Sequence, residues 1–93
     1  MAKKIHMDVG SVQGVISLLE RKKQELTNLL SDTSSAVRDL EENEWSGASP
    51  DQFYGEYKLL FTDVVAQVDH MGALADRLRK AVADFEAAAA KLS

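Results

Sequence analysis

The chain of 93 residues has the length and composition of one small folded unit. Hydrophobic residues make up 45% of it and charged residues 28%, as is typical of a soluble globular protein. Its 11 Lys and Arg against 15 Asp and Glu give a net charge of -4, so no nucleic-acid partner is expected. No apolar run approaches the roughly 20 residues of a membrane-spanning helix, so stable membrane insertion is not expected either.

The absence of cysteine excludes disulfides, thiol nucleophiles and thiolate metal sites together. The single proline is Pro50, and the stretches on either side of the middle contain few helix breakers. Lys3 and Lys4 are not followed by a long apolar stretch, so a secretory signal peptide is not expected. The sequence therefore predicts an all-α fold in a single domain, residues 1–93.

A first helix is predicted over about residues 9–43. Apolar residues recur at spacings of four and three, and seven of the nine seam positions are apolar. These positions are Val12, Ile16, Leu19, Lys23, Leu26, Leu30, Thr33, Val37 and Leu40. The preceding positions, including Val15 and Leu29, are mostly apolar too, which makes the stripe about three residues wide per heptad. Asp8 is expected to cap the helix, with Ser11 as the alternative.

A turn is predicted at residues 44–48, between two antiparallel helices. The acidic residues Glu41, Glu42 and Glu44 are unfavourable at the negative end of the first helix, and Gly47 permits a positive φ. A connection this short makes the two helices neighbours in a helix-turn-helix hairpin. At 1.5 Å per residue, the rod should be about 50 to 65 Å long.

A second helix is predicted over about residues 49–91, with Ser49 as its cap and Pro50 at its first position. Its seam positions are Phe53, Tyr57, Leu60, Val64, Gln67, Met71, Leu74, Leu78, Ala81, Phe85, Ala88 and Leu92. This frame places Gly72 on the outer face, where glycine costs about 1 kcal/mol relative to alanine without breaking the helix.

Both stripes are wider than one hairpin can bury, because each helix has a single neighbour. The surplus apolar residues are the predicted dimer interface: Val15, Leu29, Tyr54, Phe61, Val68 and Val82. Burying large side chains at roughly 1.5 to 3 kcal/mol each offsets an association cost of about 4 to 15 kcal/mol. We therefore expect two hairpins to dimerise into a four-helix bundle. The alternatives are a hairpin that tolerates the exposure and three shorter helices with a break near Gly72.

A polar layer is predicted halfway along the rod, formed by Lys23, Gln67 and His70. In an antiparallel hairpin with this turn, facing residues have numbers that sum to roughly 93, which places Lys23 opposite His70 and Gln67 opposite Leu26. Such a layer weakens association while fixing its register. An acidic residue opposite Lys23 in a paralogue would favour a heterodimer over a homodimer.

No constellation of catalytic or metal-binding residues is evident in the sequence. His6 and His70 lack partners at the spacings of a nucleophile, a base or a closed metal site, so no enzymatic activity, metal or cofactor is expected. Acidic and basic residues alternate on the polar faces, whereas helices that lie on membranes are usually rich in Lys and Arg. Trp45 at the turn either caps the end of the core or forms a recognition feature.

The turn sequence Trp45-Ser46-Gly47, centred between two long helices and followed by Ser49 and Phe53, resembles the WXG family of ESAT-type proteins. These proteins are exported by bacterial type VII secretion systems. The resemblance covers the whole chain, with Ser49 where the family usually has alanine. It implies a hairpin that forms a homodimer, or a heterodimer with a paralogous WXG protein. It also implies folding in the cytoplasm, export without a signal peptide and recognition by a membrane-bound secretion ATPase, with the turn motif as recognition residues.

One feature of the family is missing. Its members often carry Tyr-x-x-x-Asp/Glu after the second helix as an export signal, but the two tyrosines here are Tyr54 and Tyr57. The resemblance implies a non-enzymatic secretion substrate that acts as a dimeric binding partner, adaptor or chaperone for exported proteins. The alternatives are a membrane-perturbing secreted effector and a structural helical dimerisation module unrelated to secretion.

Overall fold

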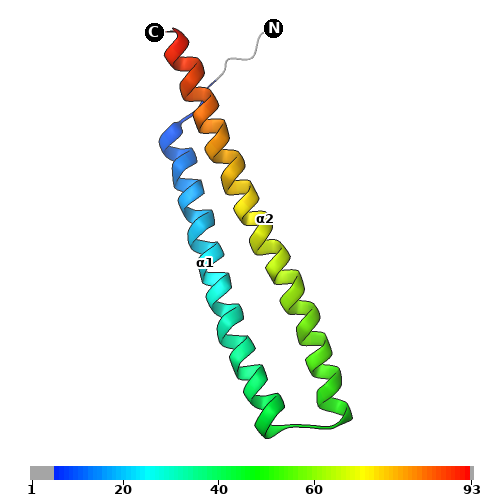
Figure 1. The fold of residues 1–93 in the computed structure, drawn as a ribbon. Coiled ribbons are helices and arrows are strands. Elements are labelled where there is room, and N and C mark those ends of the chain that lie inside the picture. The colour runs from blue at the N-terminus through cyan, green and yellow to red at the C-terminus, as the bar shows by residue number, and fades with distance from the viewer. Residues whose placement is uncertain (1–5, 93) are drawn as a thin grey trace.

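The computed structural model describes residues 6–92, which form an antiparallel hairpin of two long helices (Figure 1). Helix α1 spans Val9–Asp39, and helix α2 spans Ala48–Leu92. A π-helical turn, η1, continues α1 over Leu40–Glu44. The predicted all-α hairpin is thus confirmed, and the rod measures 69 × 24 × 15 Å. Lys3 and Lys4, used in the signal-peptide argument, lie outside the described residues.

The start of α1 follows the first of the two predicted caps. The Asp8 carboxylate accepts a hydrogen bond from the Ser11 backbone N–H at 3.0 Å, and Ser11 itself lies within the helix. This bond satisfies one of the N–H groups that lack a partner in the first turn of a helix. It is also the main reason why the pKa of Asp8 is lowered from 3.8.

The connection between the helices is tighter than predicted. The Trp45 N–H donates to the Leu40 carbonyl at 2.9 Å, which closes η1, and Gly47 has the predicted positive φ, at 130°. Helix α2 then begins at Ala48, so Ser49 lies in its first turn instead of capping it as predicted. Pro50 is the third helical residue, a position where the missing N–H costs no intrahelical bond.

The seam of α1 agrees with the predicted frame. Eight of the nine predicted positions are half-buried, and Thr33 is exposed in spite of a 2.7 Å hydrogen bond between its hydroxyl and that of Tyr57. The next residue, Ser34, is half-buried. The apolar periodicity therefore identifies the face of α1 that packs on α2.

The seam of α2 agrees with the predicted frame at Tyr57, Val64, Met71, Leu78 and Phe85. The alternate seam positions lie one residue further along than predicted. Phe53, Leu60, Gln67 and Leu74 are exposed. The residues buried or half-buried against α1 are Tyr54, Tyr57, Phe61, Val64, Val68, Met71, Ala75, Leu78, Val82 and Phe85. Small residues explain the shift, because Ala75, at 0% exposure, and Gly72 let α1 approach this edge of the stripe closely.

A polar cluster crosses the hairpin near its middle. A Cβ added to Gly72 would lie 3.3 Å from Lys23 Nζ, so Gly72 faces the seam and not the outer surface as predicted. Glu20 lies between two cations, with Lys23 Nζ 3.7 Å away and Arg79 Nη2 of α2 at 3.3 Å. The predicted register is close, since Lys23 meets Gly72 two residues beyond His70. The polar partners differ, because Gln67 and His70 are both exposed.

We expect Gly72→Ala to raise the free energy of unfolding by up to about 1 kcal/mol, the difference in helix propensity between the two residues. The new Cβ meets only the flexible end of Lys23, which can move aside. Urea denaturation measures the change. Gly55→Ala is the matched control, because nothing lies within 4 Å of its Cβ. Destabilisation by Gly72→Ala but not by Gly55→Ala would show that the seam requires glycine.

Candidate functional site

Three aromatic rings cluster where the turn meets α2. The ring centroids of Trp45 lie 5.9 Å from Phe53 and 6.0 Å from Tyr54, and those of Phe53 and Tyr54 are 5.6 Å apart. Tyr54 is buried at 5% exposure, whereas Trp45 and Phe53 are 41% and 40% exposed. The cluster thus has one ring inside the hairpin and presents two at its surface. Both sequence interpretations of Trp45 agree with this position, since it packs on the end of the core and remains accessible.

The Tyr54 hydroxyl fastens the cluster to the turn. It donates a hydrogen bond to the Trp45 carbonyl at 2.9 Å. Burial raises the pKa of Tyr54 above 10.0, and the negative charges of Glu41 and Asp51 raise it further. The neutral hydroxyl is therefore the form that the folded turn favours.

Tyr54→Phe is expected to lower the thermal midpoint, because the Trp45 carbonyl loses its donor. The pKa of Tyr54 is raised on folding, so its contribution to stability is complete below pH 10 and is lost as the pH rises through the folded value. Between pH 8 and pH 11, the thermal midpoint should fall less steeply with rising pH for Tyr54→Phe than for the wild type. Tyr57→Phe, which removes the hydroxyl that contacts Thr33, is the control and should keep the steeper fall.

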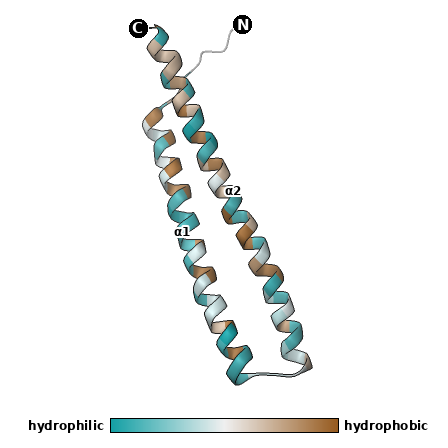
Figure 2. Ribbon diagram, in the orientation of Figure 1, coloured by the Kyte–Doolittle hydropathy of each residue, from teal (hydrophilic) through white to brown (hydrophobic). Residues whose placement is uncertain are grey.

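Figure 2 shows that hydrophobic residues recur along the whole length of both helices. Large apolar side chains remain exposed on one face of the hairpin. We call this surface the apolar face; its large side chains lie just outside the seam, on the same side of both helices. They are Val15, Leu18 and Leu29 of α1 and Phe53, Leu60 and Leu74 of α2, with exposures of 48%, 43%, 57%, 40%, 56% and 39%. Exposed apolar residues in one continuous row are characteristic of protein-binding surfaces.

The residues predicted for the dimer interface divide between two places. Val15 and Leu29 lie on the apolar face. Tyr54, Phe61, Val68 and Val82 lie in the seam between α1 and α2, with Tyr54 and Val82 only 5% and 6% exposed. Phe53, Leu60 and Leu74, which were predicted for the α2 seam, are exposed on the apolar face instead. Gln67, between the last two, is also on this face.

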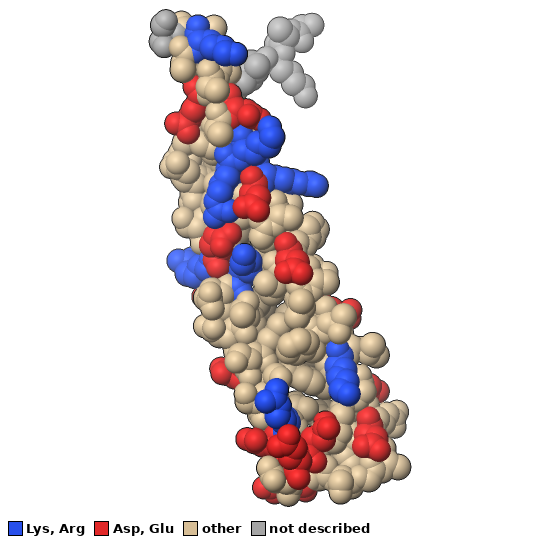
Figure 3. Space-filling view, in the orientation of Figure 1, with Lys and Arg blue, Asp and Glu red and all other residues tan. Residues whose placement is uncertain are grey.

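Charge is distributed unevenly along the rod. Residues 32–63, which include the turn, contain eight acidic and two basic residues, whereas the rest of the chain has seven acidic and nine basic ones. Figure 3 shows acidic side chains gathered at the turn and most of the basic ones above them. The half-exposed Trp45 and Phe53 therefore lie at a strongly negative end.

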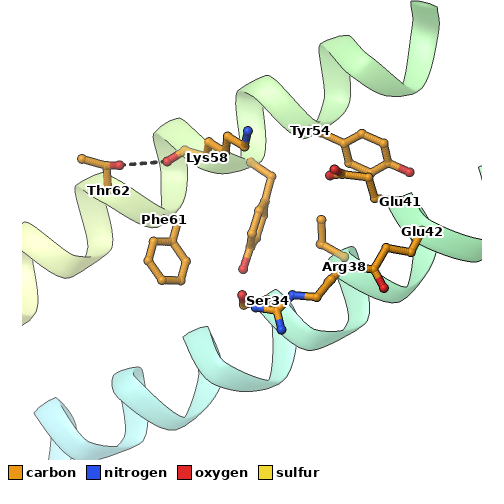
Figure 4. Close-up of a pocket in the computed structure, with 10 residues that line it drawn as sticks. Ser34, Arg38, Glu41, Glu42, Tyr54, Lys58, Phe61 and Thr62 are labelled. Atoms are coloured by element: carbon orange, nitrogen blue, oxygen red, sulfur yellow. Dashed lines mark hydrogen bonds between the residues drawn. The ribbon is translucent and has the colours of Figure 1, made fainter. Parts of the chain in front are cut away.

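A groove follows the face opposite the apolar face. It consists of two adjoining hollows of about 540 and 400 Å³, which share Ser34, Arg38 and Phe61. Figure 4 shows the first of them. Periodicity does not reveal it, because its polar residues read as ordinary solvated surface. Two signals in the sequence point to it: three serines in residues 31–35 and the only two cations of the acidic half, Arg38 and Lys58.

Two further findings limit the chemistry of the described residues. Within residues 6–92, no helix has the length and hydropathy needed to cross a bilayer. In the same part of the chain, no three His, Asp or Glu side chains are grouped so that they could hold a metal ion. The surfaces that stand out are the aromatic turn, the apolar face and the groove.

The hairpin with Trp45 and Gly47 in its turn defines a class of small helical proteins. The family model WXG100, described as proteins of 100 residues with WXG, matches residues 4–89. The chain belongs to this family, as its resemblance predicts, and is a small ESAT-like, secretion-associated protein. No curated protein and no solved structure matches the chain.

Proposed function

We propose that this protein is a non-enzymatic substrate of a type VII secretion system that acts as a dimeric binding partner, adaptor or chaperone for exported proteins. The apolar face is the observation that carries the proposal. Six large side chains, each at least 39% exposed, lie in a row that one hairpin leaves uncovered. A second hairpin, of this chain or of a paralogous WXG protein, would bury them in a four-helix bundle.

The charges that border the apolar face favour an antiparallel arrangement of two copies. Near the turn its borders are acidic and exposed, with Asp32 and Asp39 on α1 and Glu56 and Asp63 on α2. The border of the other half includes the exposed cations Arg77 and Lys91. Asp84 lies between them and is paired with Lys80 at 2.9 Å. Two copies side by side with their turns together would oppose like charges, whereas antiparallel copies oppose carboxylates and cations.

The polar residues of the proposed interface are Lys22 and Gln67. Lys22 falls between Val15 and Leu29 on the apolar face, and it pairs with Glu25 at 3.1 Å. Lys23, proposed from the sequence for this place, is within the hairpin. Two copies packed about their midpoints bring both Lys22 side chains together, so an acidic residue at the matching position of a paralogue would favour a heterodimer.

The turn supplies the surface for the secretion ATPase. Trp45 and Phe53 present two half-exposed rings, and exposed aromatic side chains are frequent anchors of protein interfaces. Gly47 allows the turn that holds them, and Ser49 lies in the first helical turn between them. Recognition of a folded turn requires no signal peptide, so the chain would fold in the cytoplasm and be secreted afterwards.

An export assay in the native host tests the proposal. In the wild-type host, tagged protein is expected in the culture medium. In a strain that lacks the secretion ATPase, it should remain inside the cells. Trp45→Ala should remain folded by circular dichroism and be exported less. Equal export with and without the ATPase would contradict the proposal. Normal export of the Trp45→Ala variant would contradict the role of the turn in recognition. Light scattering on a sizing column tests dimerisation separately.

A further inference from the structure

The groove opposite the apolar face has the shape of a site for a third helix. Along α1 and η1 it extends from Thr27 to Glu42, about 22 Å at 1.5 Å per residue, which is about four helical turns. Its walls on α1 include the short side chains of Ser31, Ser34 and Ser35. Short side chains allow the axes of two helices to approach to about 8 to 10 Å.

The floor of the groove is apolar but narrow. Leu30, Phe61 and Val68 are half-buried there, and Val65 is 37% exposed. Val65 is the only large hydrophobic residue among those lining the groove that is exposed, against six on the apolar face. This surface suits the narrow apolar stripe of one amphipathic helix better than a second hairpin with its broad face.

The charges of the groove indicate which charged residues a helix bound in it should have. Arg38 extends from α1 beside Ser34, and Lys58 lies on the α2 side (Figure 4). Among the described residues neither cation forms an ion pair, although Glu41 and Glu42 line the same groove. The middle of the groove therefore offers an unpaired guanidinium next to a hydroxyl, and its turn end offers two carboxylates.

We propose that this groove binds an amphipathic helix of a partner protein, with an acidic residue of that helix on Arg38 and a basic residue near Glu41 and Glu42. A guanidinium and a hydroxyl are a strong donor set for a carboxylate. The interaction uses the face that a dimer leaves open, so one chain holds a second hairpin on one side and a partner helix on the other. It requires neither dimerisation nor export and goes beyond the proposed function.

A designed peptide tests the groove directly. The probe is a fluorescein-labelled, hydrocarbon-stapled, alanine-based helix of 15 residues, with leucines three and four residues apart. One glutamate borders the leucine stripe, and one lysine follows it by a helical turn. In the swapped probe, the glutamate is replaced by arginine. Fluorescence anisotropy measures binding to the full chain.

Arg38→Glu is expected to weaken binding of the first probe about tenfold or more, the effect of losing one charge-assisted contact. The swapped probe should bind Arg38→Glu at least as tightly as the first probe binds the wild type. Arg21→Glu is the matched control, because Arg21 is exposed on α1 outside the groove, and it should change neither affinity. Ser34→Leu, which fills the groove, should weaken both probes.

Three results would overturn the proposal. One is that the first probe does not bind the wild type, and another is that Arg38→Glu and Arg21→Glu weaken its binding equally. The third is that Leu29→Glu, on the apolar face, abolishes binding while Arg38→Glu does not. Circular dichroism of each variant shows whether the hairpin is folded, so lost binding by an unfolded variant is not counted as support.

Discussion

Leu60→Glu is expected to convert the proposed dimer, of about twice the 10.2 kDa chain mass, into a monomer that keeps its helical hairpin. Leu60 is 56% exposed on the apolar face, so the new carboxylate is hydrated in the monomer. In the dimer it would be buried, which forfeits about 1.5 to 3 kcal/mol of apolar burial and adds several kcal/mol for desolvation of the charge. The dissociation constant of the dimer should rise at least about 100-fold.

Light scattering and sedimentation equilibrium over a dilution series measure this change. Leu59→Glu is the control, because Leu59 is 69% exposed on the side of α2 that points away from both the seam and the apolar face. It makes the same chemical change next to Leu60 and should leave the dimer intact. A dimer that survives Leu60→Glu, or equal dissociation of both variants, would show that the apolar face is not the interface.

Gly47→Val is expected to lower the free energy of unfolding by about 2 kcal/mol or more. Gly47 has a φ of 130°, a conformation that a β-branched residue adopts only with strain. The distorted turn should also move Trp45 relative to Phe53 and Tyr54, and therefore reduce the tryptophan fluorescence change on unfolding.

Urea denaturation of Gly47→Val and Gly14→Val distinguishes strain in the turn from the general effect of replacing glycine by valine. Gly14 is in α1, and nothing lies within 4 Å of a Cβ added there. Valine has a better helix propensity than glycine, so Gly14→Val should be neutral or slightly stabilising. Equal stability of the two variants would mean that the positive φ is not required for the turn.

The sequence predicts the hairpin because its strongest signals are local. Periodicity identifies both helices, Gly47 marks the turn, and the Asp8 carboxylate accepts from the Ser11 N–H in the first turn of α1. Each of these features depends on residues within a few positions of one another. The predicted bounds of the helices therefore differ little from those observed, with the start of α2 one residue early.

The edge of the α2 stripe that meets α1 could not be predicted in the same way. A stripe three residues wide contains two possible seams, and the choice depends on groups from distant parts of the chain. Gly72 and Ala75 make space for Lys23 and the neighbouring turns of α1, and Tyr54 reaches the Trp45 carbonyl. The assignment of the outer apolar residues of α2 changes with that choice.

The candidate site was predictable where a residue type is unusual and not where it is common. Trp45 and Phe53 are conspicuous as aromatic residues at a glycine turn, and the structure places both at the surface. Ser34 and Arg38 are ordinary polar residues of a helix, and only the neighbouring helix makes them part of a groove. Because Ser34 and Arg38 are four residues apart, they share one face of α1. The groove forms only where residues of α2 lie beside that face.

The thin seam also determines how the molecule responds to a pulling force. Among the described hydrophobic residues only Tyr54, Ala75 and Val82 are buried, and α1 begins at the end of the rod where α2 finishes (Figure 1). A force that separates those two helix ends loads the contacts one helical turn at a time, as in a zipper, and not all at once. Opening then proceeds by small successive barriers toward the turn.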